Sequence, residues 1–213
     1  SLILSVYLLS AQTSWKGTIS TAWSNPSNWT LGVPTSTMDV IIGDANFTGA
    51  NQPTISATAI CKSLIIGGTK ASTLTISKST TVSGNITIAA NGTISHGGVS
   101  LSLTGNWINN GSYSATSTNS NVLFAGTAQS LQGSNVTTFR KLTVNAGSTT
   151  TLNTNVTLSG ASSTLYVKGT LDPGDSPTYK ITGLAMTTYI NAKLKIKGAT
   201  FADNYTMSGT VTF

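Results

Sequence analysis

Few side chains in this sequence could carry out acid–base chemistry, because the 213 residues include five Asp, no Glu and one His. Asp172 and Asp175 lie close together in Asp-Pro-Gly-Asp, and acid–base cleavage of a polysaccharide needs two such carboxyl groups. The same four residues are also typical of a tight turn. Asp39 and Asp44 offer hard oxygen ligands for a cation. We expect turn or structural roles for these carboxylates, and keep polysaccharide cleavage at Asp172 and Asp175 as the enzymatic alternative.

The single histidine and the single cysteine add little further chemistry. His96 lies in Ser-His-Gly-Gly, which predicts an exposed corner, and no nucleophile motif accompanies it. Cys61 borders a predicted strand, where a lone cysteine is most often a small buried hydrophobe. One cysteine cannot form an intrachain disulfide or a cysteine-based zinc site. We therefore predict no enzymatic activity and no catalytic, cofactor-binding or metal-binding residue.

The tryptophans are the strongest candidates for ligand contact. Three of the four lie within the first 29 residues, and the set comprises Trp15, Trp23, Trp29 and Trp107. A Trp-rich, non-repeating segment is typical of a cap over the open end of a repeat protein. The flat faces of the same rings could instead stack on sugars. We expect a cap, and keep glycan contact by these four residues as the alternative.

The composition predicts an uncharged polar surface. Thr, Ser and Asn supply 84 of the 213 residues, and only 8% of the residues are charged. This bias favours strands and corners over helices. The net charge of +6 would suit a polyanion, although scattered lysines such as Lys193, Lys195 and Lys197 also guard strand edges. No cluster mixes basic and aromatic residues, so we expect no nucleic-acid partner.

A repeat of about 21 residues organises the middle of the chain. It is marked by glycines that lie 21, 21, 21 and 22 residues apart, namely Gly84, Gly105, Gly126, Gly147 and Gly169. An apolar residue stands two places before each of the first three glycines, and this register slips at Gly147. A repeat of this length is typical of a solenoid.

Within each repeat the apolar residues alternate with Thr or Ser, as in Ile86-Thr87-Ile88 and Leu101-Ser102-Leu103. This period of two predicts short strands with one buried face. A β-sandwich would also alternate, usually with strands about 8 to 12 residues apart. Two or three strands per 21 residues favour an all-β chain folded as a right-handed parallel β-helix with a Trp-rich N-terminal cap. We expect about five turns between Lys62 and Leu171, stacked about 4.8 Å apart.

One part of the sequence resembles a known class of proteins. The pattern includes Trp15-Lys16-Gly17, Asn28-Trp29, Gly32-Val33-Pro34 and Asp39-Val40-Ile41-Ile42. It resembles the start of secreted bacterial β-helical surface proteins, such as autotransporter-like passengers and large adhesins of gliding and biofilm-forming bacteria. The resemblance covers roughly residues 15–172. It implies export and a β-helix, and proteins of this class serve adhesion, matrix building or glycan chemistry.

The two ends of the chain leave alternatives open. Residues 1–11 form an uncharged apolar run that resembles the later part of a signal peptide, with cleavage after Ala11, or a retained strand that covers a β edge. We assign residues 12–60 to the cap and first strands, and 61–213 to the β-helix. The end within an apolar alternation predicts either a fragment of a longer protein or an edge for another subunit.

We therefore expect a secreted or cell-surface β-helix with a structural or adhesive role, in a bacterial surface protein, an extracellular filament or a biofilm matrix. The expected partners are further copies of the chain or other surface proteins. The alternative function is a glycan-binding module with a polysaccharide partner. We expect no membrane insertion of the mature chain.

Overall fold

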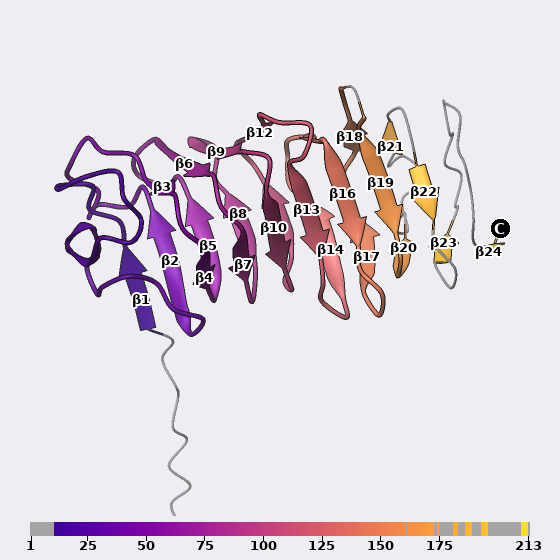
Figure 1. Cartoon of the computed structure of the whole chain (residues 1–213), viewed down its shortest axis with the longest axis horizontal. Helices are drawn as coiled ribbons and strands as arrows, with labels where there is room; N and C mark the ends of the chain where they lie inside the picture. The colour runs from indigo at the N-terminus through magenta and orange to yellow at the C-terminus, as the bar shows by residue number, and fades with distance from the viewer. Residues whose placement is uncertain are drawn as a thin grey trace, which may run out of the picture.

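The strands of this chain pair in parallel, each with the equivalent strand of the next turn. The computed structural model describes residues 11–160, 162–172, 174, 181–182, 186–188, 193–195 and 210–212. In these residues every pairing between named strands is parallel, and the strands stack along one axis as a β-solenoid (Figure 1).

The described strands form four sheets on three faces of the solenoid. The first face is a ten-stranded sheet of β1 (Ala11–Ser14), β2 (Met38–Ile42), β5 (Ser63–Ile66), β8 (Ile86–Ile88), β11 (Trp107–Asn109), β14 (Gln129–Gln132), β17 (Thr149–Leu152), β20 (Thr170–Asp172), β23 (Lys193–Lys195) and β24 (Thr210–Thr212). The second face is a seven-stranded sheet of β4 (Ala59–Cys61), β7 (Thr80–Val82), β10 (Ser100–Leu103), β13 (Asn121–Phe124), β16 (Lys141–Val144), β19 (Thr164–Val167) and β22 (Met186–Thr188). The third face consists of a four-stranded sheet, β3 (Thr54–Ile55), β6 (Ser72–Ile76), β9 (Gly92–His96) and β12 (Ser112–Ala115), and a three-stranded sheet, β15 (Thr137–Phe139), β18 (Val156–Leu158) and β21 (Ile181–Thr182).

The spacing of paired residues confirms the predicted repeat. Leu101 pairs with Thr80 in the turn before and with Val122 in the turn after, so 21 residues separate equivalent positions in both directions. Longer corners add residues, and Trp107 pairs with Leu131, 24 positions later. The predicted all-β solenoid is therefore confirmed, and the β-sandwich alternative is wrong because its sheets would be antiparallel.

The core consists of apolar ladders that run along the solenoid, one inward-facing residue per turn. The longest ladder on the first face joins buried residues that pair in register, Val40, Leu64, Ile86, Trp107, Leu131 and Leu152. The alternating residues point outward, which gives strands such as β6 and β9 their buried–intermediate–buried pattern. The period of two in the sequence therefore predicts the inward residues correctly.

The repeated glycines all lie at the corner between the second and first faces. A Cβ at Gly105 would overlap the backbone of Gly84, and one at Gly126 would overlap the carbonyl oxygen of Thr104. Gly147 differs, because no atom lies within 4 Å of its Cβ position and its φ is +79°. Close approach of successive turns thus explains Gly105 and Gly126, whereas backbone conformation explains Gly147.

Side-chain amides link successive turns at the same corner. The Asn106 backbone N–H donates to Asn85 Oδ1 over 2.7 Å, and the Ser130 N–H donates to Asn106 Oδ1 over 2.8 Å. At the next corner, the Gly68 N–H donates to Asn91 Oδ1 over 2.7 Å, and Asn91 Nδ2 donates to the Gly68 carbonyl over 2.8 Å. These bonds satisfy backbone groups that the strand ladders leave unpaired where the chain turns.

The N-terminal segment forms the predicted Trp-rich cap beside β1 and β2 (Figure 1). Trp29 packs edge to face against Trp15 and Trp23, with ring centroids 4.9 Å and 4.7 Å away. Asn28 ends the short 3-10 helix η1 (Pro26–Asn28) and is completely buried. Its amide accepts from two backbone N–H groups, of Ile19 and Ser20, and donates to Ser20 Oγ and the Ala22 carbonyl. A fully bonded amide and three packed indoles hold this non-repeating segment in one conformation.

The third face is interrupted between β12 and β15, where no ladder joins the two sheets. An aromatic cluster fills the interior at this point, formed by Trp107, Tyr113 and Phe139. The Tyr113 and Phe139 rings, from neighbouring turns, have centroids 5.4 Å apart. This separation exceeds the spacing of about 4.7–4.9 Å between paired strands, which explains why β12 and β15 do not pair.

Toward the C-terminus, β21, β23 and β24 lie inside three segments predicted as strands, 179–182, 189–196 and 210–213. The strand β22 was not predicted. Residues 1–10 lie outside the described part, so the signal-peptide and retained-strand alternatives for that run stay predictions. Ala11, assigned to the same run, is the first residue of β1.

Replacement of Gly126 by Ala should destabilise the solenoid, because the new methyl group would meet the Thr104 carbonyl of the preceding turn. We expect a loss of about 2–3 kcal/mol in the free energy of unfolding, as for overpacked cores. Gly147→Asn is the matched control, since it lies at the equivalent corner in open space and Asn tolerates a positive φ at a cost below about 1 kcal/mol. Urea unfolding followed by Trp fluorescence measures both, and equal losses would contradict the role of close approach.

Candidate functional site

The structure buries all four tryptophans that were candidates for glycan contact. Their exposed fractions are 0% for Trp15, 4% for Trp23, 2% for Trp29 and 0% for Trp107. Three of the indole N–H groups donate inside the protein, from Trp15 to the Asn51 carbonyl, from Trp29 to the Trp23 carbonyl and from Trp107 to Thr137 Oγ1. Glycan stacking on these three rings is therefore wrong, because their faces are covered by the core.

Trp23 is the exception among the four. It lines a surface pocket of about 120 Å³ together with Val33, Pro34 and the segment 57–60. Its Nε1 atom is buried and has no hydrogen-bond partner among the described residues. A buried indole donor without an acceptor is costly, so an acceptor supplied by a ligand would be favoured here. Of the predicted glycan contacts, only Trp23 stays a candidate.

The carboxylates do not converge on a catalytic pair in the described residues. Asp39 accepts from Ser63 Oγ over 2.5 Å and forms an ion pair with Lys62 at 3.6 Å. Asp44 accepts from Ser14 Oγ, the Asn46 N–H and Asn46 Nδ2. No group of three His, Cys, Asp or Glu side chains that could hold a metal occurs in the described part of the chain. Asp39 and Asp44 thus serve hydrogen bonding at the start of the solenoid.

Asp172 has the turn role that its sequence context predicts. Its Oδ1 accepts from the Gly174 N–H over 3.1 Å, and Gly174 has a φ of +77°. The side chain thereby closes an Asx-type turn over Pro173. Asp175, the second carboxylate of the enzymatic alternative, lies outside the described residues.

His96 is buried, so its predicted exposed corner is wrong. It is the last residue of β9, it is 0% exposed, and it stands in register with Ile76 and Ala115 on the inner side of the third face. Its Nδ1 lies 2.7 Å from the Tyr113 hydroxyl. Burial lowers the pKa of His96 from 6.5 to about 4, against a smaller opposing effect from the Val99 backbone. The imidazole is therefore neutral at physiological pH, as an apolar ladder requires.

Cys61 is a buried residue, as predicted. It pairs with Val82 in an inward ladder of the second face, and it is 0% exposed. Desolvation, with a smaller contribution from nearby Asp39, raises the pKa of the thiol to about 12. The thiol stays protonated and serves packing, because only the thiolate is an effective nucleophile.

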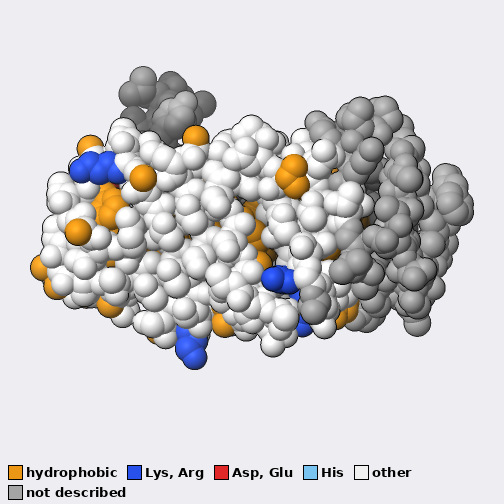
Figure 2. Space-filling model, turned by 90° about the horizontal axis from the view of Figure 1, so that it is seen from above, with side chains coloured by type: hydrophobic (Ala, Val, Ile, Leu, Met, Phe, Trp, Pro, Cys, Tyr) orange, Lys and Arg blue, Asp and Glu red, His pale blue; other side chains and the backbone are white. Residues whose placement is uncertain are grey.

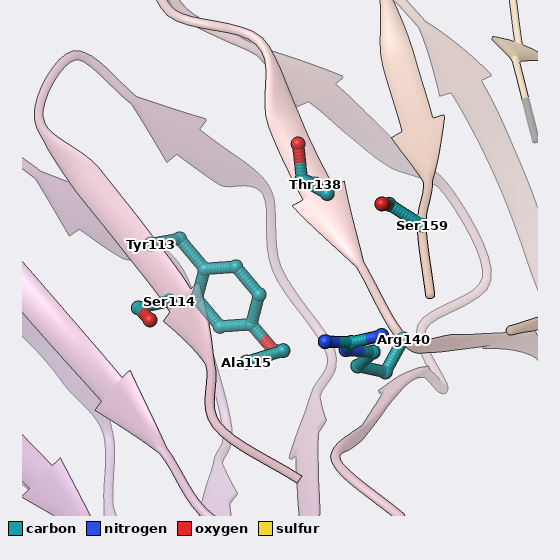
Figure 3. Close-up of a pocket in the computed structure, with 6 residues that line it drawn as sticks. All are labelled: Tyr113, Ser114, Ala115, Thr138, Arg140 and Ser159. Carbon is teal, nitrogen blue, oxygen red and sulfur yellow. The ribbon is translucent and has the colours of Figure 1, made fainter. Parts of the chain in front are cut away.

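A second pocket lies at the interruption of the third face, between the ends of β12 and β15 (Figure 3). Its volume is about 180 Å³, and it is lined by Tyr113, Ser114, Ala115, Thr138, Arg140 and Ser159. The Arg140 guanidinium extends from the end of β15 toward Tyr113 and Ala115 (Figure 3). Figure 2 looks down on this side of the molecule, where hydrophobic atoms show between polar side chains near a basic side chain.

Sequence reasoning did not find this pocket. Tyr113 and Arg140 are 27 positions apart and come together only because β12 and β15 lie in successive turns. One signal was present, because Arg140 is the single arginine in a chain whose other basic residues are lysines. The exchange of Lys for Arg is typical of sites that need a planar, bidentate cation.

In the residues that the structure describes, no helix is long and apolar enough to cross a membrane.

The burial of His96 predicts a loss of stability in acid. The unfolded chain binds the proton near pH 6.5 and the folded chain only near pH 4, so the unfolded state holds more protons in between. The free energy of unfolding should fall by up to about 3 kcal/mol as the pH drops from about 6.5 to 4. His96→Gln, which can still bond to Tyr113, should lose this pH dependence.

The single imidazole also gives a direct readout by NMR. Its ring signals should stay unchanged down to pH 5 in the folded protein. A midpoint near 6.5 would show that the ring is solvated and would contradict the burial.

Comparison with known families places most of this geometry in one family. The family model described as "Domain of unknown function (DUF8693)" matches residues 14–123. The matched segment begins in β1, includes the Trp-rich cap, and ends in β13. No curated protein and no solved structure matches the chain. Since the match covers more than half of the 213 residues, the chain belongs to the family of the domain of unknown function DUF8693.

Proposed function

We propose that this protein is a non-enzymatic, extracellular rod that serves a structural or adhesive role in a bacterial surface protein or fibre. The observation that carries the proposal is the continuity of the inward ladders, which run in register from Val40 beside the cap to Leu152. Parallel strands that bond each turn to the next resist bending and extension along the axis. Such a rod is suited to hold other parts of a surface protein away from the cell.

The surface of the rod supports the same proposal. Outward strand positions carry Thr and Ser, as in β6 and β8, and Figure 2 shows isolated basic side chains on a mostly uncharged polar surface. Short neutral side chains remain hydrated without attracting one another strongly. The resemblance to secreted bacterial β-helical proteins places this rod outside the cell, where the single buried thiol needs no reducing compartment.

Electron microscopy of the native protein, with sequencing of its mature N-terminus, tests the rod proposal. We expect thin rods or filaments, and a mature chain that begins near Ser1 would identify the apolar run as an assembly strand. Dispersed short rods that begin at Gln12 would identify an export signal and favour an adhesive segment. Release of sugar products from polysaccharides by the purified chain would contradict the non-enzymatic role.

A glycan-binding module is the second candidate, and the Trp23 pocket favours it. A sugar hydroxyl could accept from the unpartnered Nε1, while Val33 and Pro34 supply apolar contact. Trp23→Phe retains an aromatic ring beside Trp29 but removes the donor.

Titration with soluble neutral oligosaccharides tests this second candidate. We expect Trp23→Phe to bind several-fold more weakly, since one hydrogen bond contributes about 0.5–1.5 kcal/mol. Trp107→Phe, in the core far along the chain, is the matched control and should bind as the parent protein does. Equal binding by Trp23→Phe, or no binding by the parent protein, would reject the pocket.

A further inference from the structure

We propose that the pocket between β12 and β15 binds a carboxylate-bearing sugar, such as a uronic acid unit of an acidic polysaccharide, with Arg140 as its anchor. This site is distinct from the Trp23 pocket and adds a ligand to the rod. It does not depend on whether the rod assembles.

The first argument is the state of Arg140. Its side chain is half-buried at the pocket, and no hydrogen bond or ion pair joins it to another described residue. A guanidinium is charged at every physiological pH and loses hydration when partly buried. An anion that enters the pocket would restore the lost interactions, and a planar carboxylate matches the planar fork of the guanidinium with two parallel hydrogen bonds.

The second argument is that the chain leaves room for this guanidinium. Gly160 has a φ of +100°, and a Cβ at this position would overlap Nη1 of Arg140. The backbone of the turn that follows β18 therefore packs closely against the guanidinium. Any other residue at position 160 would push the Arg140 side chain away from its present place, so Gly160 helps to define the site.

The third argument concerns the rest of the lining. Ser114, Thr138 and Ser159 are exposed around the pocket, and their hydroxyls make no hydrogen bond to another described residue. Hydroxyls of this kind can donate to and accept from the hydroxyls of a sugar. Tyr113 adds an aromatic wall, and its own hydroxyl is held by His96. A cation, three hydroxyls and one ring together match an acidic monosaccharide.

Size and charge decide between this ligand and other anions. Pockets for drug-sized ligands have volumes of about 300–1,000 Å³, so a pocket of about 180 Å³ suits one sugar unit. Phosphate groups usually attract several cations, whereas this pocket has one arginine in its lining. An acidic peptide would use the guanidinium but leave most of the hydroxyls without partners. The lining therefore favours a uronic acid.

Isothermal titration of the full chain with short oligogalacturonides and with glucuronate-containing oligosaccharides tests the proposal. We expect saturable binding of at least one of these acids. Methyl-esterified oligogalacturonides, which keep the sugar and lose the charge, should bind at least tenfold more weakly. Polyaspartate and sulfate serve as further probes, and equal binding of either would overturn the sugar assignment.

Variants then locate the site. Arg140→Gln should weaken binding at least tenfold, Arg140→Lys should retain part of it, and Gly160→Ala should weaken it while keeping the charge. Lys141→Gln is the matched control, because Lys141 is the next residue, carries the same charge and already donates to Asn119 Oδ1. Thermal unfolding of each variant shows that it is folded. Equal losses in Lys141→Gln and Arg140→Gln, or no binding of either acid by the parent chain, would overturn the proposal.

Discussion

The backbone hydrogen bonds between successive turns set the terms for the rest of this structure. They hold neighbouring strands at a spacing of about 4.7–4.9 Å, and every side chain in the core must fit within that step. Small β-branched and aliphatic residues do so, which gives the ladders of Val, Leu and Ile. At the corners the constraint is tighter, so Gly105 and Gly126 occupy positions where a Cβ would overlap the turn below. Asn85, Asn106 and Asn91 then supply the bonds that the strands cannot make.

The same constraint explains where the solenoid departs from regularity. Trp107, Tyr113 and Phe139 bring three large rings into adjacent turns, and their centroid separations of 5.1–5.5 Å exceed the step between strands. The first and second faces remain paired through this region, whereas the third face opens between β12 and β15. Packing of the core thus creates a hollow on the surface, and the single arginine lies beside it. The cap at the other side of the described chain is closed by Asn28 and three indoles, and leaves only a smaller pocket beside Trp23.

The sequence predicted what depends on neighbours along the chain, and missed what depends on contacts between turns. Leu101-Ser102-Leu103 and the spacing of Gly84, Gly105 and Gly126 are local patterns, so the strands, the repeat and the fold followed from them. His96 was misplaced because Gly97-Gly98 suggested that the corner began one residue early, although the alternation from Ile94 already pointed His96 inward. The burial of Trp107 follows from the same alternation. Arg140 could not be found in this way, because its surroundings depend on a sheet interruption that involves residues 27 positions away.

The pairing of each turn with only its two neighbours has a consequence for how such a chain can change in evolution. A duplication of about 21 codons would add one complete turn and extend the rod by one step, because both new surfaces match the existing ones. Rod length can therefore change through recombination between repeats without a new core being assembled residue by residue. The interruption between β12 and β15 would move along the axis with each such event while its lining stays intact. Members of one lineage could in this way present the same pocket at different heights above the cell.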